Sequence, residues 1–314
     1  MLNFFYKIIR FAKQKSTIIF ICGMVAGVFV VSQVAFRNDT IKNKKKDFNQ
    51  TSPPKVYLPE VPEEIDFAGE KVPLEKPEVT ESLDRELLYN YNGRGQLTLI
   101  LKLSQRNFPI IEKILKENNV PIDFKYLCVA ESNLQNLTSS VGAKGYWQFM
   151  KDTGPGFGLE IGDDVDERYD LERSTNAACK YLKLAYSKFG NWTAAAASYN
   201  CGMARYDDLS QFQHTKFYYD LLLPEETNRY IFRILSFKYL MENAKDFGYL
   251  VDVTNGYQIH KTKTVIVETS IPDLSQWALN KGTNYKILKI LNPWLRDRSL
   301  SVKSGKKYII KLPL

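Results

Sequence analysis

The sequence predicts a mainly α-helical protein that ends in a small β-α-α-β unit, and three observations point to this fold class. From about Glu81 to Phe247, apolar residues recur at three- and four-residue spacing in runs such as LTLILKL, FPIIEKIL and YIFRILSFKYLM. This spacing is the period of an amphipathic helix. Gly and Pro separate the runs, and no convincing β-alternation intervenes. The tail from about Tyr257 has a different pattern, which begins with the strand-like KTVIVETS.

The tail contains four short elements in a recognisable order. KTVIVETS alternates like a strand, PDLSQWALN and NYKILKILN have the pattern of two short helices, and KKYIIKLPL returns to a strand. We therefore expect a helical domain over residues 81–250 and a separate β-α-α-β module over residues 257–314.

The N-terminal region has the composition of a membrane segment. Residues Thr17 to Phe36 carry no charge across 20 positions, which at about 1.5 Å per residue spans roughly 30 Å of hydrocarbon. Basic residues flank both sides, so the charge pattern gives no clean orientation. We predict a signal anchor, or transmembrane helix, over residues 1–36, and a cleaved secretory signal is the alternative.

A linker is expected between this segment and the helical domain. Residues 37–80 are rich in Lys, Glu, Asn and Pro, and six prolines interrupt any long helix. Further along, an acidic run at Asp163, Asp164, Asp166 and Glu167 has the density of a solvated loop.

Charge and cysteine content exclude several classes of protein. The formal net charge is +8, but many of the basic residues flank the apolar segment and the chain contains no recognised nucleic-acid-binding motif, so we expect no nucleic-acid partner. The four cysteines form no CxxC pair, and the histidines are only His214 and His260. We therefore predict no structural zinc site. A disulfide between Cys179 and Cys201 stays open, although buried free thiols are favoured.

One acidic residue lies on an apolar helix face. The segment PIDFKYLCVAE places Phe124, Leu127 or Cys128, and Glu131 at helical spacing. A carboxyl group on such a face is desolvated, which raises its pKa and lets it donate a proton near neutral pH. The pattern alone is weak, because many helices end with an acidic residue that turns toward water.

Four motifs in order give the pattern a specific meaning. These are ESNLQNLTSSVGAKGYWQFM, DERYDLERSTNAACKYLKLAY, AAAASYNCG and LPEETNRYIFRI. Together they resemble the signature of the soluble-lytic-transglycosylase family of peptidoglycan-cleaving enzymes, and within it the membrane-bound lytic murein transglycosylase D-like group. The resemblance implies a goose-type, lysozyme-like helical catalytic domain.

The resemblance also implies roles for individual residues. Glu131 matches the catalytic acid/base of the family. Ser139 matches the serine before Gly142, although the spacer is one residue shorter than the family pattern and Ser140 could take that place. The resemblance places substrate-binding side chains at Ser132, Ser139, Gln148, Tyr199, Asn200 and Tyr230.

The implied reaction needs no second carboxylate, metal or cofactor. The acid protonates the oxygen that leaves with N-acetylglucosamine, and the acetamide of N-acetylmuramic acid assists at C1. The ionised glutamate then accepts the proton of the C6 hydroxyl, which closes a 1,6-anhydro ring. A lysozyme-like muramidase and a non-catalytic peptidoglycan-binding scaffold are the alternatives.

The tail carries a separate resemblance, whereas the cellular location follows from the family resemblance. The β-α-α-β order and KILNPW, with Asn292 and Pro293, resemble a degenerate LysM-like module that binds glycan; a structural cap on the catalytic domain is the alternative. The family resemblance implies a cell-envelope protein that is anchored in the membrane by the N-terminal helix and has its catalytic domain in the periplasm. Its partners would be peptidoglycan strands, and any envelope proteins that recruit it stay unidentified.

Overall fold

The computed structural model describes residues 58–252 and 254–314 of the chain. The predicted membrane segment, and the linker up to residue 57, lie outside these residues. Within the described residues, no helix combines the length and the hydropathy that a membrane span requires.

The helical domain confirms the predicted helical pattern. Its helices are α2 (Pro77–Asn92), α3 (Arg94–Glu117), α4 (Phe124–Ser132), α5 (Leu171–Phe189), α6 (Trp192–Cys201), α7 (Met203–Phe212) and α8 (Glu225–Glu242). It also contains the short hairpin strands β1 (Asp66–Phe67) and β2 (Glu70–Lys71) and the 3-10 helices η1 (Gly154–Phe157), η2 (Glu167–Tyr169) and η3 (Tyr218–Asp220).

Ordered structure begins earlier than the predicted linker boundary at residue 80. Phe67 of β1 is fully buried and meets the Phe124 ring edge to face, with ring centroids 5.2 Å apart. Pro77 occupies the first turn of α2, where a proline costs no hydrogen bond. Within the described residues, Pro62 and Pro73 therefore flank a hairpin, and Pro77 starts a helix.

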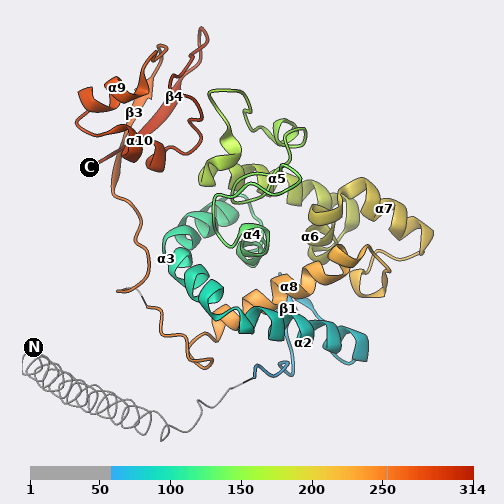
Figure 1. The fold of residues 1–314 in the computed structure, drawn as a ribbon. Coiled ribbons are helices and arrows are strands. Elements are labelled where there is room, and N and C mark those ends of the chain that lie inside the picture. Colours follow the sequence, from blue (N-terminus) through green and yellow to red (C-terminus); the bar gives the residue numbers. More distant parts are fainter. Residues whose placement is uncertain (1–57, 253) are drawn as a thin grey trace, which may run out of the picture. The chain divides into compact units, whose positions relative to one another are not determined.

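Helix α8 contacts three other helices of the helical domain. It packs against α2, α4 and α6 (Figure 1). Helix α6 contains four consecutive alanines, residues 194–197, that are all fully buried, so this turn is enclosed on every side, and their small side chains allow neighbouring helices to approach closely. This packing brings the C-terminal end of α4 against the first half of α8.

The C-terminal module has the predicted β-α-α-β order. It consists of β3 (Thr262–Val267), α9 (Leu274–Asn280), α10 (Tyr285–Leu291) and β4 (Tyr308–Pro313), and β3 pairs antiparallel with β4. Asn292 is fully buried: its side-chain amide donates to the Lys311 carbonyl at 2.7 Å and its Oδ1 accepts from the Lys311 N–H at 2.7 Å. The N-P turn thus joins the end of α10 to β4.

The acidic run packs against the C-terminal module and is not the solvated loop that its charge density predicted. Val165 is buried in the apolar core of the C-terminal module and forms a β-bridge with Leu295. The Asp166 N–H donates to the Trp294 carbonyl at 2.9 Å, and the Arg296 N–H donates to the Asp164 carbonyl at 2.8 Å. The prediction was wrong because the partners of this run come from far along the chain.

Candidate active site

Glu131 is the penultimate residue of α4. The helix ends at Asn133, which takes a left-handed conformation with φ of 54° and donates its N–H to the Val129 carbonyl. This ending leaves Glu131 half-buried, with the hydroxyl of Tyr230 on α8 donating a hydrogen bond to its Oε1. Within the described residues, the other carboxyl oxygen has no hydrogen-bond partner.

The surroundings raise the pKa of Glu131 to about 7, and burial is the main cause. The hydrogen bond from Tyr230 and the positive charge of Arg233 act in the opposite direction, whereas the negative charge of Glu226 raises the pKa further. A carboxyl group with this pKa exchanges between its neutral and ionised forms near neutral pH, as a group that acts first as acid and then as base requires.

A tight loop follows Glu131, and we call residues 133–150 the active-site loop. Thr138 pairs with Lys144, and Lys144 pairs with Phe149, in a compact antiparallel arrangement. Ser139 closes the turn, because its Oγ accepts the N–H of Ala143 at 3.0 Å. The neighbouring Ser140 is exposed, so the structure gives the turn-closing role to Ser139.

Two glycines are required by the shape of this loop. Gly142 and Gly145 have φ values of 89° and 84°, in the region that favours glycine. A Cβ on Gly145 would lie 1.8 Å from the carbonyl oxygen of Arg168, whereas a Cβ on Gly142 would meet no atom within 4 Å. Gly145 therefore needs to be glycine because of close packing as well as because of its positive φ.

Ser132 and Gln148, two of the predicted substrate-binding residues, bond to the loop backbone. The buried Ser132 hydroxyl donates to the Tyr146 carbonyl at 2.7 Å. The Gln148 side-chain amide donates to the Gly145 carbonyl at 2.7 Å, from a backbone with φ of 49°. These contacts give both side chains a part in holding the shape of the loop.

Tyr199 and Asn200 lie at the end of α6 and connect three elements around Glu131. The Tyr199 hydroxyl donates to the Trp147 carbonyl at 2.8 Å, which ties α6 to the active-site loop. Asn200 accepts from the Thr227 hydroxyl at 2.8 Å, and its amide donates to Glu226 Oε1 at 3.4 Å. The structure therefore brings Tyr199, Asn200 and Tyr230 to the same place as Glu131.

The sequence interpretation missed three residues on α8: Glu226, Thr227 and Arg233. Glu226, Tyr230 and Arg233 follow one another at i, i+4 and i+7, so they share one helix face. The sequence contains this spacing, which starts inside the LPEETNRY motif. The spacing indicates a role near Glu131 only when α4 is known to pack on that face of α8.

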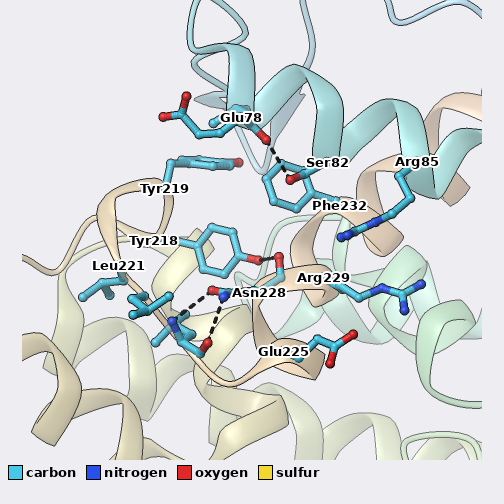
Figure 2. Close-up of a pocket in the computed structure, with 13 residues that line it drawn as sticks. Glu78, Ser82, Arg85, Tyr218, Tyr219, Leu221, Glu225, Asn228, Arg229 and Phe232 are labelled. Atoms are coloured by element: carbon cyan, nitrogen blue, oxygen red, sulfur yellow. Dashed lines mark hydrogen bonds between the residues drawn. The ribbon is translucent and has the colours of Figure 1, made fainter.

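A cavity of about 300 Å³ lies beside the end of α4. Its lining comes from α2, α3, α4 and α8 and includes Tyr89, Asn90, Gln96, Ala130, Asn133 and Arg233. A second cavity, of about 520 Å³, lies between α2, the η3 region and the first half of α8, and contains none of the predicted site residues (Figure 2). The cavity beside α4 does not include Glu131 or another predicted site residue either, but its lining contains Ala130, the neighbour of Glu131 in the chain, and Arg233, which lowers the pKa of Glu131.

The described part of the chain offers no cluster of three or more His, Cys, Asp or Glu side chains that could hold a metal ion. Cys128, Cys179 and Cys201 are free thiols, so the structure does not contain the disulfide that the sequence left open.

Comparison with known families defines the class of protein to which this fold and site correspond. Residues 108–219 match the family described as Transglycosylase SLT domain, and residues 263–314 match the soluble lytic transglycosylase C-terminal LysM-like domain. The chain thus contains an SLT transglycosylase domain followed by a LysM-like domain, which confirms the predicted fold class and family resemblance. Tyr230 lies beyond the first match, and its hydroxyl donates a hydrogen bond to Glu131.

The chain is also similar to individual proteins. The chain is 25% identical over 252 residues to membrane-bound lytic murein transglycosylase D of Escherichia coli K12, and equally to the same protein of the O6:H1 strain CFT073. The match covers 78% of this chain and 54% of each relative, so the chain spans about half the length of the curated relatives it matches. A solved structure of an inactive mutant of lytic transglycosylase Slt from Pseudomonas aeruginosa is 20% identical, with a TM-score of 0.36, and the match covers 48% of this chain and 26% of that one.

Proposed function

We propose that this protein is a lytic transglycosylase that cleaves the β-1,4 bond between N-acetylmuramic acid and N-acetylglucosamine in peptidoglycan. The observation that carries the proposal is the pair formed by Glu131 and Tyr230, in which burial raises the pKa of the carboxyl group to about 7. The SLT domain match supports the same reaction class.

In the first step, protonated Glu131 acts as the general acid. Tyr230 donates to Oε1, so the acidic proton is carried by Oε2, the oxygen without a protein partner in the described residues. Transfer of this proton to the glycosidic oxygen releases N-acetylglucosamine, while the acetamide oxygen of the muramic acid residue bonds to C1.

In the second step, ionised Glu131 acts as the general base. The Tyr230 hydroxyl and the charge of Arg233 stabilise the carboxylate, because both lower the pKa of Glu131. The carboxylate takes the proton of the C6 hydroxyl, whose oxygen attacks C1 and displaces the acetamide. The product is a 1,6-anhydro-muramoyl end, and Glu131 is again protonated.

The remaining predicted residues would bind and orient the glycan. Asn200 is fixed by Thr227 and Glu226 next to the reacting groups, which suits an amide that contacts a sugar substituent. Ser139 and Gln148 shape the active-site loop, and we assign them to the wall of the glycan groove. Tyr199 and Ser132 hold that loop from beneath.

Product analysis tests the proposed reaction. Purified peptidoglycan digested with the wild type should yield 1,6-anhydro ends by mass spectrometry, and Glu131→Gln should yield at most about 1% of that product, since general acid-base catalysis contributes roughly 10²- to 10⁴-fold. Full activity of the Gln variant would refute the role of Glu131.

Hydrolysis is the second candidate reaction, and Glu226 is the observation that favours it. This carboxylate lies near enough to raise the pKa of Glu131 and is held by Asn200. A glycosidase with two carboxylates could use it to activate water. Reducing ends among the products, together with loss of activity in Glu226→Gln, would establish hydrolysis; anhydro ends from an active Glu226→Gln would exclude it.

We further propose that residues 1–36 anchor the protein in the membrane of the cell envelope, and that the C-terminal module contacts glycan strands. The 20 uncharged residues from Thr17 to Phe36 support the anchor, and the LysM-like match supports glycan contact. Membrane fractionation of the full chain, compared with a chain that begins at residue 37, tests the anchor. Co-sedimentation of Glu131→Gln with purified peptidoglycan, with and without residues 257–314, tests the glycan contact.

A further inference from the structure

We propose that the C-terminal module positions the active-site loop, with Arg296 as the positioning residue that acts through Tyr169. Only the activity measurements below rest on the proposed function; the structural link itself does not. The link passes through residues 164–169, which we call the brace segment.

The module holds the brace segment by backbone and side-chain contacts. In addition to the Val165 bridge, the Asp164 carboxylate accepts the Ser301 N–H at 2.7 Å. On the flanks of the segment, the Tyr308 hydroxyl donates to Glu160 Oε1 at 2.9 Å, and Lys311 pairs with Glu172 at 2.7 Å. Contacts from several parts of the module therefore fix the brace segment on both sides.

The brace segment in turn holds the active-site loop through a buried ion pair. Asp166 and Arg168 are 4% and 2% exposed, and the Asp166 carboxylate accepts from Arg168 Nε at 2.9 Å and Nη2 at 2.7 Å. The free Nη1 of Arg168 donates to the Phe149 carbonyl at 3.2 Å. The Arg168 carbonyl packs directly on Gly145, so two parts of the loop rest on one residue of the brace segment.

Tyr169 makes the second connection. Its carbonyl accepts the Asn136 side-chain amide at 2.8 Å, and its hydroxyl lies 3.1 Å from Thr138 Oγ1. The Arg296 guanidinium of the module lies 3.9 Å from the centre of the Tyr169 ring, which is a cation-π contact. Arg296 is itself held by a hydrogen bond from Nη1 to the Pro293 carbonyl at 3.0 Å. The ring is thus fixed between the module and the loop.

The loop then reaches the groups that flank Glu131. The carbonyls of Tyr146 and Trp147 accept the hydroxyls of Ser132 and Tyr199. A displacement of the loop would move the groups next to the reacting carboxyl. Loss of the Arg296 contact should therefore reduce catalysis itself, and not only binding of long strands.

The test uses the full chain with Arg296→Met, Arg296→Lys and Tyr169→Phe. Lys303→Met is the matched control, because Lys303 is an exposed cation of the same module. We expect kcat/KM of Arg296→Met to fall by up to about tenfold on a short soluble glycan fragment and on whole peptidoglycan alike, since one cation-π contact and its neighbours hold the loop. Arg296→Lys should recover part of this loss, and Tyr169→Phe, which lacks the Thr138 contact, should show a similar loss.

A loss confined to whole peptidoglycan would overturn the proposal, because it would make the module a strand-binding unit only. Unchanged kinetics in Arg296→Met would overturn it as well. Hydrogen exchange tests the structural link independently of the proposed enzymatic activity. Amides of the active-site loop should exchange faster in Arg296→Met than in Lys303→Met whether or not the protein cleaves glycan. Equal exchange in the two variants would refute the link.

Discussion

At the scale of single residues, the surroundings of Glu131 predict how the protein responds to pH. Burial raises the pKa of this carboxyl group to about 7, and the first step of the proposed reaction needs the protonated form. We expect kcat/KM to decrease as pH rises through about 7. A profile with no ionisation near this value would contradict the assignment of Glu131 as the acid.

The same shift predicts a pH-dependent stability of Glu131→Gln. The folded pKa of Glu131 is raised above its usual value of 4.5, so the native state binds more protons than the unfolded state between these pH values and loses stability as pH rises. In Glu131→Gln the side chain at position 131 does not titrate. The free energy of unfolding of this variant should therefore rise by at most about 3 kcal/mol relative to that of the wild type between pH 4 and pH 8. Urea unfolding at both pH values measures this difference. An equal stability difference at the two values would refute the shift.

Tyr230→Phe removes the hydroxyl that donates to Glu131. Because this hydrogen bond lowers the pKa of Glu131, the variant should move the descending limb of the pH-rate profile to higher pH. Loss of a hydrogen bond to a charged group, about 1.5–3 kcal/mol, should also lower kcat by at least about tenfold. Tyr206→Phe is the control, because that buried hydroxyl bonds to the Lys216 carbonyl and not to the site. A profile that keeps its wild-type position would contradict the role of Tyr230.

At the scale of elements, the active-site loop depends on its glycines to different degrees. Gly145→Ala would place a Cβ 1.8 Å from the Arg168 carbonyl oxygen, in addition to the cost of positive φ. Gly142→Ala carries only the positive-φ cost, about 1 kcal/mol. We expect Gly145→Ala to be the more destabilising by at least about 1 kcal/mol and to lose most activity, as measured by thermal unfolding and product release. Equal effects would show that the loop can shift away from the brace segment.

The sequence predicted the helical elements and the carboxyl group at the end of α4, because periodicity and local motifs carry this information. It placed Glu131 on the apolar face of a helix, and the structure agrees. It could not predict that Arg233 would affect the pKa of Glu131, because α4 and α8 are distant in sequence and their contact depends on packing. The early hairpin was missed for a related reason: Phe67 has no periodic pattern around it, and only its burial against Phe124 reveals its role.

At the scale of the whole molecule, the acidic run shows the limit of local interpretation. Asp164 and Asp166 have the composition of a solvated loop, but one accepts a hydrogen bond from Ser301 and the other neutralises the buried Arg168. A high density of charged residues indicates exposure only when no hydrogen-bonding or ion-pairing partner comes from another part of the chain. Here the partners come from a module that the sequence had assigned to a separate domain.

The docked module should unfold together with the helical domain. Val165 belongs to the helical domain by sequence, yet its side chain is 1% exposed in the core of the module. Val165→Ser should cost about 2 kcal/mol, because it removes buried apolar surface and introduces a hydroxyl into an apolar core. Calorimetry should show one transition at a lower temperature, since the lost contact is shared by both parts.

Ile266→Ser is the control for this prediction, because Ile266 lies in the module on β3 but is 59% exposed. It should leave the transition temperature almost unchanged. Two separate transitions in Val165→Ser, with only one displaced from its wild-type position, would mean that the module folds independently. In that case the contacts of Val165 would not couple the unfolding of the module to the unfolding of the helical domain.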